Sequence, residues 1–130
     1  MVMSQTQAAL ETFISPKHLE GLDLAKACAN LALDKKAENL SILEISQLTS
    51  FADFFVICSA GSERQAQAIA RHIETEMREQ GIMPLGIEGS VEGHWILIDL
   101  GATIVHVFTK ETRDYYDLDG LWVDAPVHEL

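Results

Sequence analysis

The spacing of apolar residues along the chain predicts alternating helices and strands. The first apolar stripe at helical spacing is Leu24, Cys28, Leu31 and Ala32. Ser15-Pro16 offers an N-cap followed by proline at the first helical position, so a helix is expected from there to about Lys36. Gly21 would interrupt this helix or delay its start.

The next segments predict two strands and a second helix. Leu40 to Ile45 alternates apolar and polar residues, whereas Asp53 to Ser59 is a continuous apolar run, typical of a central strand covered on both faces. Ser62 and Gln65 form a capping-box pair, and the helix that follows runs up to Gly81. Its apolar stripe is Ala66, Ile69, Ala70, Ile73 and Met77.

The C-terminal half predicts mainly strands. Leu85 to Glu88 is a short strand, and a polar turn from Gly89 to Gly93 follows it. Trp95 to Leu100 and Thr103 to Phe108 flank the tight turn at Gly101-Ala102, so we expect a β-hairpin.

Together these elements indicate a single α/β domain with a mixed β-sheet of about five strands packed against helices. A short helix is expected at Glu111 to Tyr116, followed by an irregular segment that carries Trp122. We place the domain at residues 16–126, after an N-terminal extension at 1–15 whose order the pattern does not define. Residues 127–130 are expected to be a tail.

Composition and charge narrow the possible functions. A chain of 130 residues with 48% hydrophobic residues suits one domain, and its net charge of −11 repels phosphate backbones. The acidity either serves solubility or indicates a basic protein partner. No apolar run reaches membrane-spanning length and no signal or transit pattern opens the chain, so we expect a cytoplasmic protein without a membrane segment.

Candidate catalytic chemistry is sparse. Cys28 and Cys58 are interpreted as buried hydrophobic residues, and the five histidines lack metal-ligand spacing. The Gly61-Ser62 turn before a helix raises the alternative of a nucleotidyltransferase, but no paired carboxylates accompany Asp99 to hold two metal ions. Neither a nucleophile elbow nor a basic RNA-binding stripe occurs. We therefore expect no enzyme activity, no cofactor and no metal.

Six ordered segments of the chain form a recognisable series. They are Asp53-Phe54-Phe55-Val56-Ile57, Gly61-Ser62-Glu63-Arg64, Pro84-Leu85-Gly86-Ile87-Glu88-Gly89, Trp95-Ile96-Leu97-Ile98-Asp99-Leu100-Gly101, Val105-His106-Val107-Phe108 and Arg113-Asp114-Tyr115-Tyr116-Asp117-Leu118 leading to Leu121-Trp122. In this order and spacing they resemble the RsfS/Iojap family of ribosomal silencing factors. The resemblance covers about Leu19 to Pro126 and departs where the family commonly has Gly-Thr-Ser and Arg-His, here Ala60-Gly61-Ser62 and Arg64-Gln65.

The resemblance implies a function and a fold. It implies a protein that binds the fourteenth protein of the large ribosomal subunit, blocks joining of the two subunits and represses translation when nutrients are limited. It also implies a nucleotidyltransferase-like fold without that activity, and frequent homodimers. Direct, sequence-specific nucleic-acid binding is not expected, in keeping with the charge.

The expected partner-binding residues lie mainly in the hairpin region. By resemblance Trp95 contacts the partner, although a core position is its alternative. Glu88 and Asp99 are expected at the rim, with a solvated charge as the alternative for each and a bond to the turn at Gly101 as a further one for Asp99. The full expected set is Trp95, Leu85, Glu88, Gly89, Asp99 and Tyr116.

Two further positions remain open from sequence. Tyr115 and Tyr116 project about 100° apart on a helix, so one of them is expected in the core, and Tyr116 is the one that aligns with the family's tyrosine. His106, between two valines of a strand, is interpreted as a sheet histidine with satisfied hydrogen bonds and not as a catalytic base.

Overall fold

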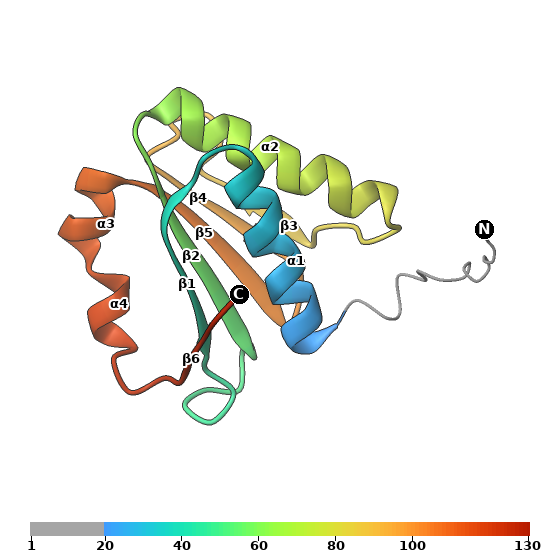
Figure 1. Cartoon of the computed structure of the whole chain (residues 1–130), viewed down its shortest axis with the longest axis vertical. Coiled ribbons are helices and arrows are strands. Elements are labelled where there is room, and N and C mark those ends of the chain that lie inside the picture. The colour runs from blue at the N-terminus through green and yellow to red at the C-terminus, as the bar shows by residue number, and fades with distance from the viewer. Residues whose placement is uncertain (1–19) are drawn as a thin grey trace.

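The computed structural model describes residues 20–130 and forms one mixed sheet with helices on both faces (Figure 1). The strands lie in the order β3-β4-β5-β2-β1-β6. The helices and strands are α1 (Gly21–Asp34), β1 (Glu38–Glu44), β2 (Phe54–Ala60), α2 (Glu63–Glu79), β3 (Gly86–Glu88), β4 (Trp95–Asp99), β5 (Thr103–Thr109), α3 (Lys110–Tyr116), α4 (Leu118–Leu121) and β6 (Val127–His128). The predicted single mixed α/β domain is confirmed.

The apolar run that predicted a central strand is β2, and all seven of its residues are buried. It pairs in parallel with β5, from Phe54 opposite Thr103 to Ala60 opposite Thr109, and antiparallel with β1. The predicted hairpin is the antiparallel pair of β4 and β5. A parallel pair needs a long crossover connection, and here α2, β3 and β4 lie in the sequence between its two strands.

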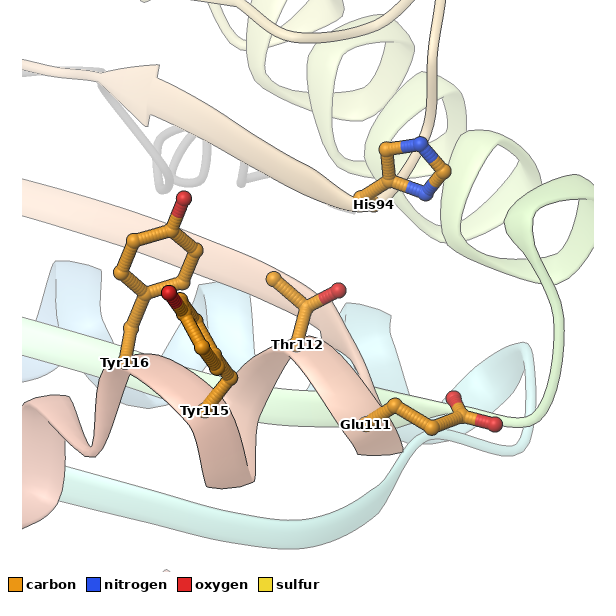
Figure 2. Close-up of a pocket in the computed structure, with 5 residues that line it drawn as sticks. All are labelled: His94, Glu111, Thr112, Tyr115 and Tyr116. Atoms are coloured by element: carbon orange, nitrogen blue, oxygen red, sulfur yellow. The ribbon is translucent and has the colours of Figure 1, made fainter.

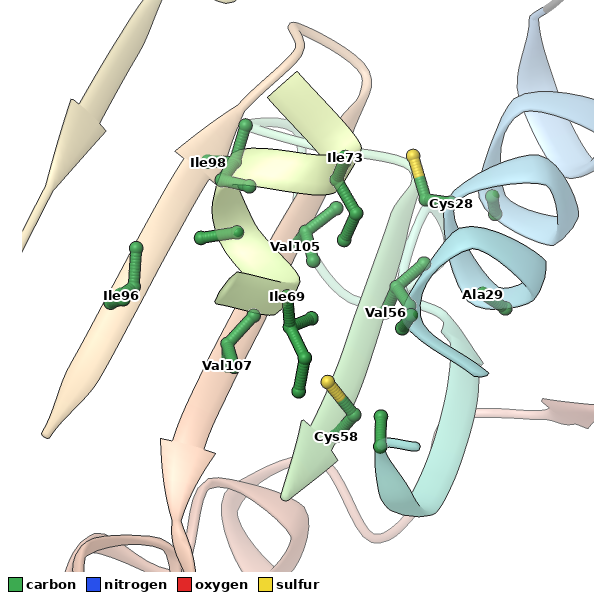
Figure 3. Close-up of a cluster of buried hydrophobic side chains, with 14 of the residues drawn as sticks. Cys28, Ala29, Val56, Cys58, Ile69, Ile73, Ile96, Ile98, Val105 and Val107 are labelled. Atoms are coloured by element: carbon green, nitrogen blue, oxygen red, sulfur yellow. The ribbon is translucent and has the colours of Figure 1, made fainter. Parts of the chain in front are cut away.

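Residues of the inner strands face two separate cores, one on each side of the sheet. Val56 and Cys58 of β2 face α1 and α2, where they pack with Cys28 and Ile69 (Figure 3). Burial raises the pKa of each cysteine thiol to about 12, so both stay protonated, as expected of buried hydrophobic residues. The second core lies under α4 and the segment after it, with members Leu43, Ile45, Ala52, Phe55, Ile57, Phe108, Leu118 and Ala125.

The two ends of the domain differ from the sequence-based expectation. The sheet has six strands instead of about five, because Val127–His128, expected in an irregular tail, pairs with β1 at Ile42 and Leu43. A hydrogen bond of 2.7 Å between His128 Nε2 and Glu44 Oε1 holds this edge strand. The expected helix start at Ser15-Pro16 and the extension at 1–15 lie outside the described residues. Within the described residues, α1 begins at Gly21.

The capping pair at the start of α2 also joins α2 to α1. Ser62 Oγ accepts the backbone N–H of Gln65 at 3.1 Å, as predicted. The Gln65 side chain does not bond back to Ser62: its Oε1 accepts the N–H of Gly61 at 2.7 Å, and its Nε2 donates to the carbonyls of Lys35 and Lys36 at 3.1 and 3.0 Å. Gln65 therefore satisfies carbonyl groups just after α1 as well as an amide before α2.

Replacing Ser62 by alanine is expected to lower the free energy of unfolding by about 1 kcal/mol, because one amide of the first turn of α2 loses its acceptor. Urea denaturation measures the change. Ser62→Asp supplies another cap oxygen and should restore most of the stability. An alanine variant as stable as the parent would mean that water replaces the cap without loss.

Candidate functional site

Among residues 20–130, no helix covers the second face of one part of the sheet. Along β4, Ile96 and Ile98 are fully buried toward α1 and α2, whereas Trp95, Leu97 and Asp99, which point the opposite way, are only half-buried. Glu88 of β3 is exposed and pairs with Leu97 across the strands. We call this surface of Glu88, Trp95, Leu97 and Asp99 the open face. A shallow pocket of about 240 Å³ lies in it, lined by Glu88, Gly89, Trp95 and Leu97.

Several aromatic side chains hold Trp95 in place at one end of the open face. Its ring stacks on Phe108 with centroids 4.8 Å apart, and Tyr116 of α3 lies 4.9 Å away on a tilted plane. Its indole N–H donates to His106 Nδ1 at 3.1 Å. The ring is thus anchored in the second core and still half exposed, while its contact with a partner stays a prediction.

His106 is the acceptor that fixes the Trp95 indole. Since the indole N–H only donates, Nδ1 must be unprotonated and the imidazole proton lies on Nε2. Burial lowers the pKa of His106 to about 4, partly opposed by attraction from Asp119, so the ring is neutral at pH 7. Nε2 is buried without a partner among the described residues, so the prediction of a fully satisfied sheet histidine is wrong at this atom.

Gly89 allows the turn after β3 to pass close to the Trp95 backbone. Its φ of +81° lies in the left-handed region, and a Cβ there would be 2.0 Å from the Trp95 carbonyl oxygen. The Gly89 carbonyl accepts the N–H of Gly93 at 2.9 Å, which closes the predicted polar turn. Glycine is thus required here for the turn to approach β4 so closely.

Asp99 and Leu85 lie at the opposite end of β4 from Trp95. Asp99 Oδ1 accepts the N–H of Gly101 at 2.9 Å, which confirms the hairpin-turn alternative for this carboxylate. Leu85 is 76% exposed, and its N–H donates to the Asp99 carbonyl at 2.7 Å. Four residue steps of strand, roughly 13 Å, separate Asp99 from Trp95, so the expected set forms two groups. Leu97, absent from that set, lies between them.

The expectation for the paired tyrosines is wrong. Tyr115 is 82% exposed and Tyr116 is 51% exposed, and α3 has no buried residue at all. The helix lies along the margin of the sheet, and the side chains of Thr112 and Tyr116 rise from it toward β4 (Figure 2). Tyr116 packs on Trp95 and so extends the open face, while Tyr115 contacts Tyr116 edge to face at 5.0 Å.

Arg113, which the sequence analysis did not single out, joins α3 to the rest of the domain. Its Nε and Nη2 donate to the two carboxylate oxygens of Asp119 at 3.0 Å each. Its Nη1 donates to Ser59 Oγ at 2.9 Å and to the Asn39 carbonyl. The guanidinium thus connects α3, α4, β1 and β2. Local sequence patterns do not predict its contact with Asn39, because the two residues are more than 70 positions apart.

The described part of the chain has neither a metal-ligand cluster nor a membrane-spanning helix. Residues 20–130 contain no cluster of three or more histidine, cysteine, aspartate or glutamate side chains placed to hold a metal ion. Within the same range, no helix combines the length and apolar character needed to span a bilayer.

Comparison with known proteins decides the family. A family model described as "Ribosomal silencing factor during starvation" matches residues 17–130. The chain belongs to this RsfS family. It is 45% identical over 108 residues to the ribosomal silencing factor RsfS of Halalkalibacterium halodurans, covering 83% of this chain and 92% of that one. For the Bacillus subtilis RsfS the identity is 43% over 107 residues, covering 82% and 91%.

A solved relative of the RsfS family has the same fold. A crystal structure of a protein from Bacillus halodurans superposes with a TM-score of 0.76 at 42% identity, covering 85% of this chain and all of the other. The resemblance read from the ordered segments is therefore confirmed. The further likeness to nucleotidyltransferases stays a prediction.

Proposed function

We propose that this RsfS-family protein is a ribosomal silencing factor that binds the fourteenth protein of the large ribosomal subunit and sterically blocks joining of the small subunit. It would act in the cytoplasm and repress translation when nutrients are limited. The observation that carries the proposal is the open face, where a half-buried tryptophan lies beside acidic residues on a rigid sheet. Family membership supports ribosome-associated silencing.

The state of Trp95 favours binding. Its N–H is already satisfied by His106, so a partner that covers the ring does not leave a buried donor unpaired. Stacking on Phe108 and Tyr116 fixes the ring before the partner arrives, which reduces the side-chain entropy lost on association. Tryptophan is also among the residues most enriched at energetically dominant positions of protein interfaces.

The charges of the open face suit a basic partner. Glu88 is exposed at the pocket rim, and Asp99 retains one carboxylate oxygen beyond its bond to Gly101. On a chain of net charge −11, these groups would steer the approach of a basic protein and fix its orientation, while the aromatic centre supplies most of the affinity. Leu85 and Gly89 would complete the contact from β3 and its flanks.

We propose binding without catalysis. The buried imidazole of His106 is neutral, and its Nδ1 is engaged by the Trp95 indole. One oxygen of the Asp99 carboxylate is bonded to the hairpin turn. Its partner on the neighbouring strand β3 is Gly86, which offers no second carboxylate to help bind metal ions. A steric role needs none of this chemistry, no cofactor and no metal.

Addition of the purified protein to separated ribosomal subunits tests the proposal. We expect it to co-sediment with the large subunit but not the small one, and to reduce formation of complete ribosomes when added before, but not after, the subunits join. A pull-down with the isolated fourteenth protein checks the partner. Unchanged subunit joining at saturating protein would contradict a silencing function.

A further inference from the structure

The geometry points to a second binding site beside the open face: the cleft between α3 and the start of β4 receives a lysine or arginine side chain of the protein partner. The inference rests on the proposed function and names a contact within it. The cleft measures about 410 Å³ and is lined by His94, Glu111, Thr112, Tyr115 and Tyr116. Figure 2 shows Thr112 and the two tyrosine rings rising from α3 toward His94, with Glu111 at the first turn of the helix.

The aromatic wall of this cleft is exposed. Tyr115 is 82% exposed, and among residues 20–130 its aromatic neighbour is Tyr116, perpendicular to it at 5.0 Å. In such an edge-to-face pair at least one ring face stays accessible, and the negative face of an aromatic ring attracts a cation. Tyr116 in turn contacts Trp95, so the cleft is continuous with the open face.

The charges around the cleft are negative because the cations of α3 are already paired. Lys110 Nζ lies 2.8 Å from Glu38 Oε1, and Arg113 is bound by Asp119. Glu111 and Asp114 form no ion pair among residues 20–130. Glu111 precedes Tyr115 by one helical turn, and its side chain extends outward from the first turn of α3 at one end of the cleft (Figure 2).

The opposite wall does not supply a free cation either. His94 Nδ1 lies 3.0 Å from Glu63 Oε2, so a carboxylate lies beside the basic group that residues 20–130 contribute to the cleft lining. A cleft lined by both a carboxylate and an exposed π face suits a guanidinium or ammonium head, and the ring surface suits its aliphatic stem. Glu111 would repel an anion in the cleft, and a purely apolar group would form no favourable contact with its carboxylate.

A direct test needs no ribosome. The purified chain is titrated with N-acetyl-arginine amide and, in parallel, with its neutral isostere N-acetyl-citrulline amide, while the ring resonances of Tyr115 and Tyr116 are followed by NMR. We expect saturable shifts with the arginine compound that are lost in Glu111→Gln, and much smaller shifts with the citrulline compound. Equal responses to both compounds, or none to either, would overturn the proposal.

Variants test the same contact in the complex. We expect Tyr115→Leu and Glu111→Gln each to weaken binding to the large ribosomal subunit about three-fold, while Tyr115→Phe, which keeps the π face, binds like the parent. Glu79→Gln removes an equal charge from an exposed position of α2 and serves as the control. Binding by Tyr115→Leu equal to that of the parent, or equal losses in Tyr115→Leu and Tyr115→Phe, would refute the site. Failure of the parent itself to bind would instead refute the proposed function.

Discussion

Trp95→Ala is expected to weaken binding to the large ribosomal subunit about 30-fold or more, which corresponds to roughly 2 kcal/mol. The substitution removes a ring that is half exposed on the open face and already fixed by His106 and Phe108. Because the partner would lose a preorganised aromatic contact, the larger part of the change should appear in the dissociation rate. Surface-immobilised large subunits allow both rates to be measured.

The Trp95 experiment needs a control for folding, since the ring also packs on the second core. Trp95→Phe keeps an aromatic ring over Phe108 but removes the donor to His106, so it separates ring contact from the hydrogen bond. Thermal unfolding of both variants runs in parallel. Unchanged affinity in a folded alanine variant would show that Trp95 does not anchor the partner, and an unfolded variant would show that its role is in the core.

Arg113→Ala is expected to lower the free energy of unfolding by about 3 kcal/mol. The Arg113 side chain is only 12% exposed, and its removal leaves the Asp119 carboxylate, the Ser59 hydroxyl and the Asn39 carbonyl without their donor. We take the lower end of the range for broken buried pairs because the Asp119 side chain is 38% exposed and gains some solvation. Urea denaturation measures the loss.

Loss of Arg113 should also weaken subunit binding, because α3 carries Tyr116 against Trp95. Arg113→Lys keeps the charge but not the paired donors to Asp119, so it should recover only part of the stability. Arg78→Ala breaks an exposed pair with Glu74 and is expected to change stability by less than about 1 kcal/mol. Equal effects of Arg113→Ala and Arg78→Ala would mean that the Arg113 contacts are exchanged for water without loss.

The sequence by itself determined those features that depend on neighbours along the chain. A run of apolar residues predicted that β2 is covered on both faces, and the repeat of apolar residues predicted which side of α2 is buried. The Ser62 cap and the Asp99 bond to Gly101 were predictable because each joins atoms only two or three residues apart. The ordered segments also indicated the family, which the comparison confirmed.

Only the tertiary structure decided how these pieces meet. Periodicity placed neither Val127–His128 beside β1 nor Arg113 against Asn39, because both contacts join residues more than 70 positions apart. The local sequence pattern also does not predict that the open face is left without a covering helix in the described part of the chain. The placement of α3 decided that both Tyr115 and Tyr116 are exposed, and the pairing of β4 with β5 brought His106 beneath Trp95. Such contacts form only when the tertiary fold brings distant segments together and the backbone holds their side chains at bonding distance.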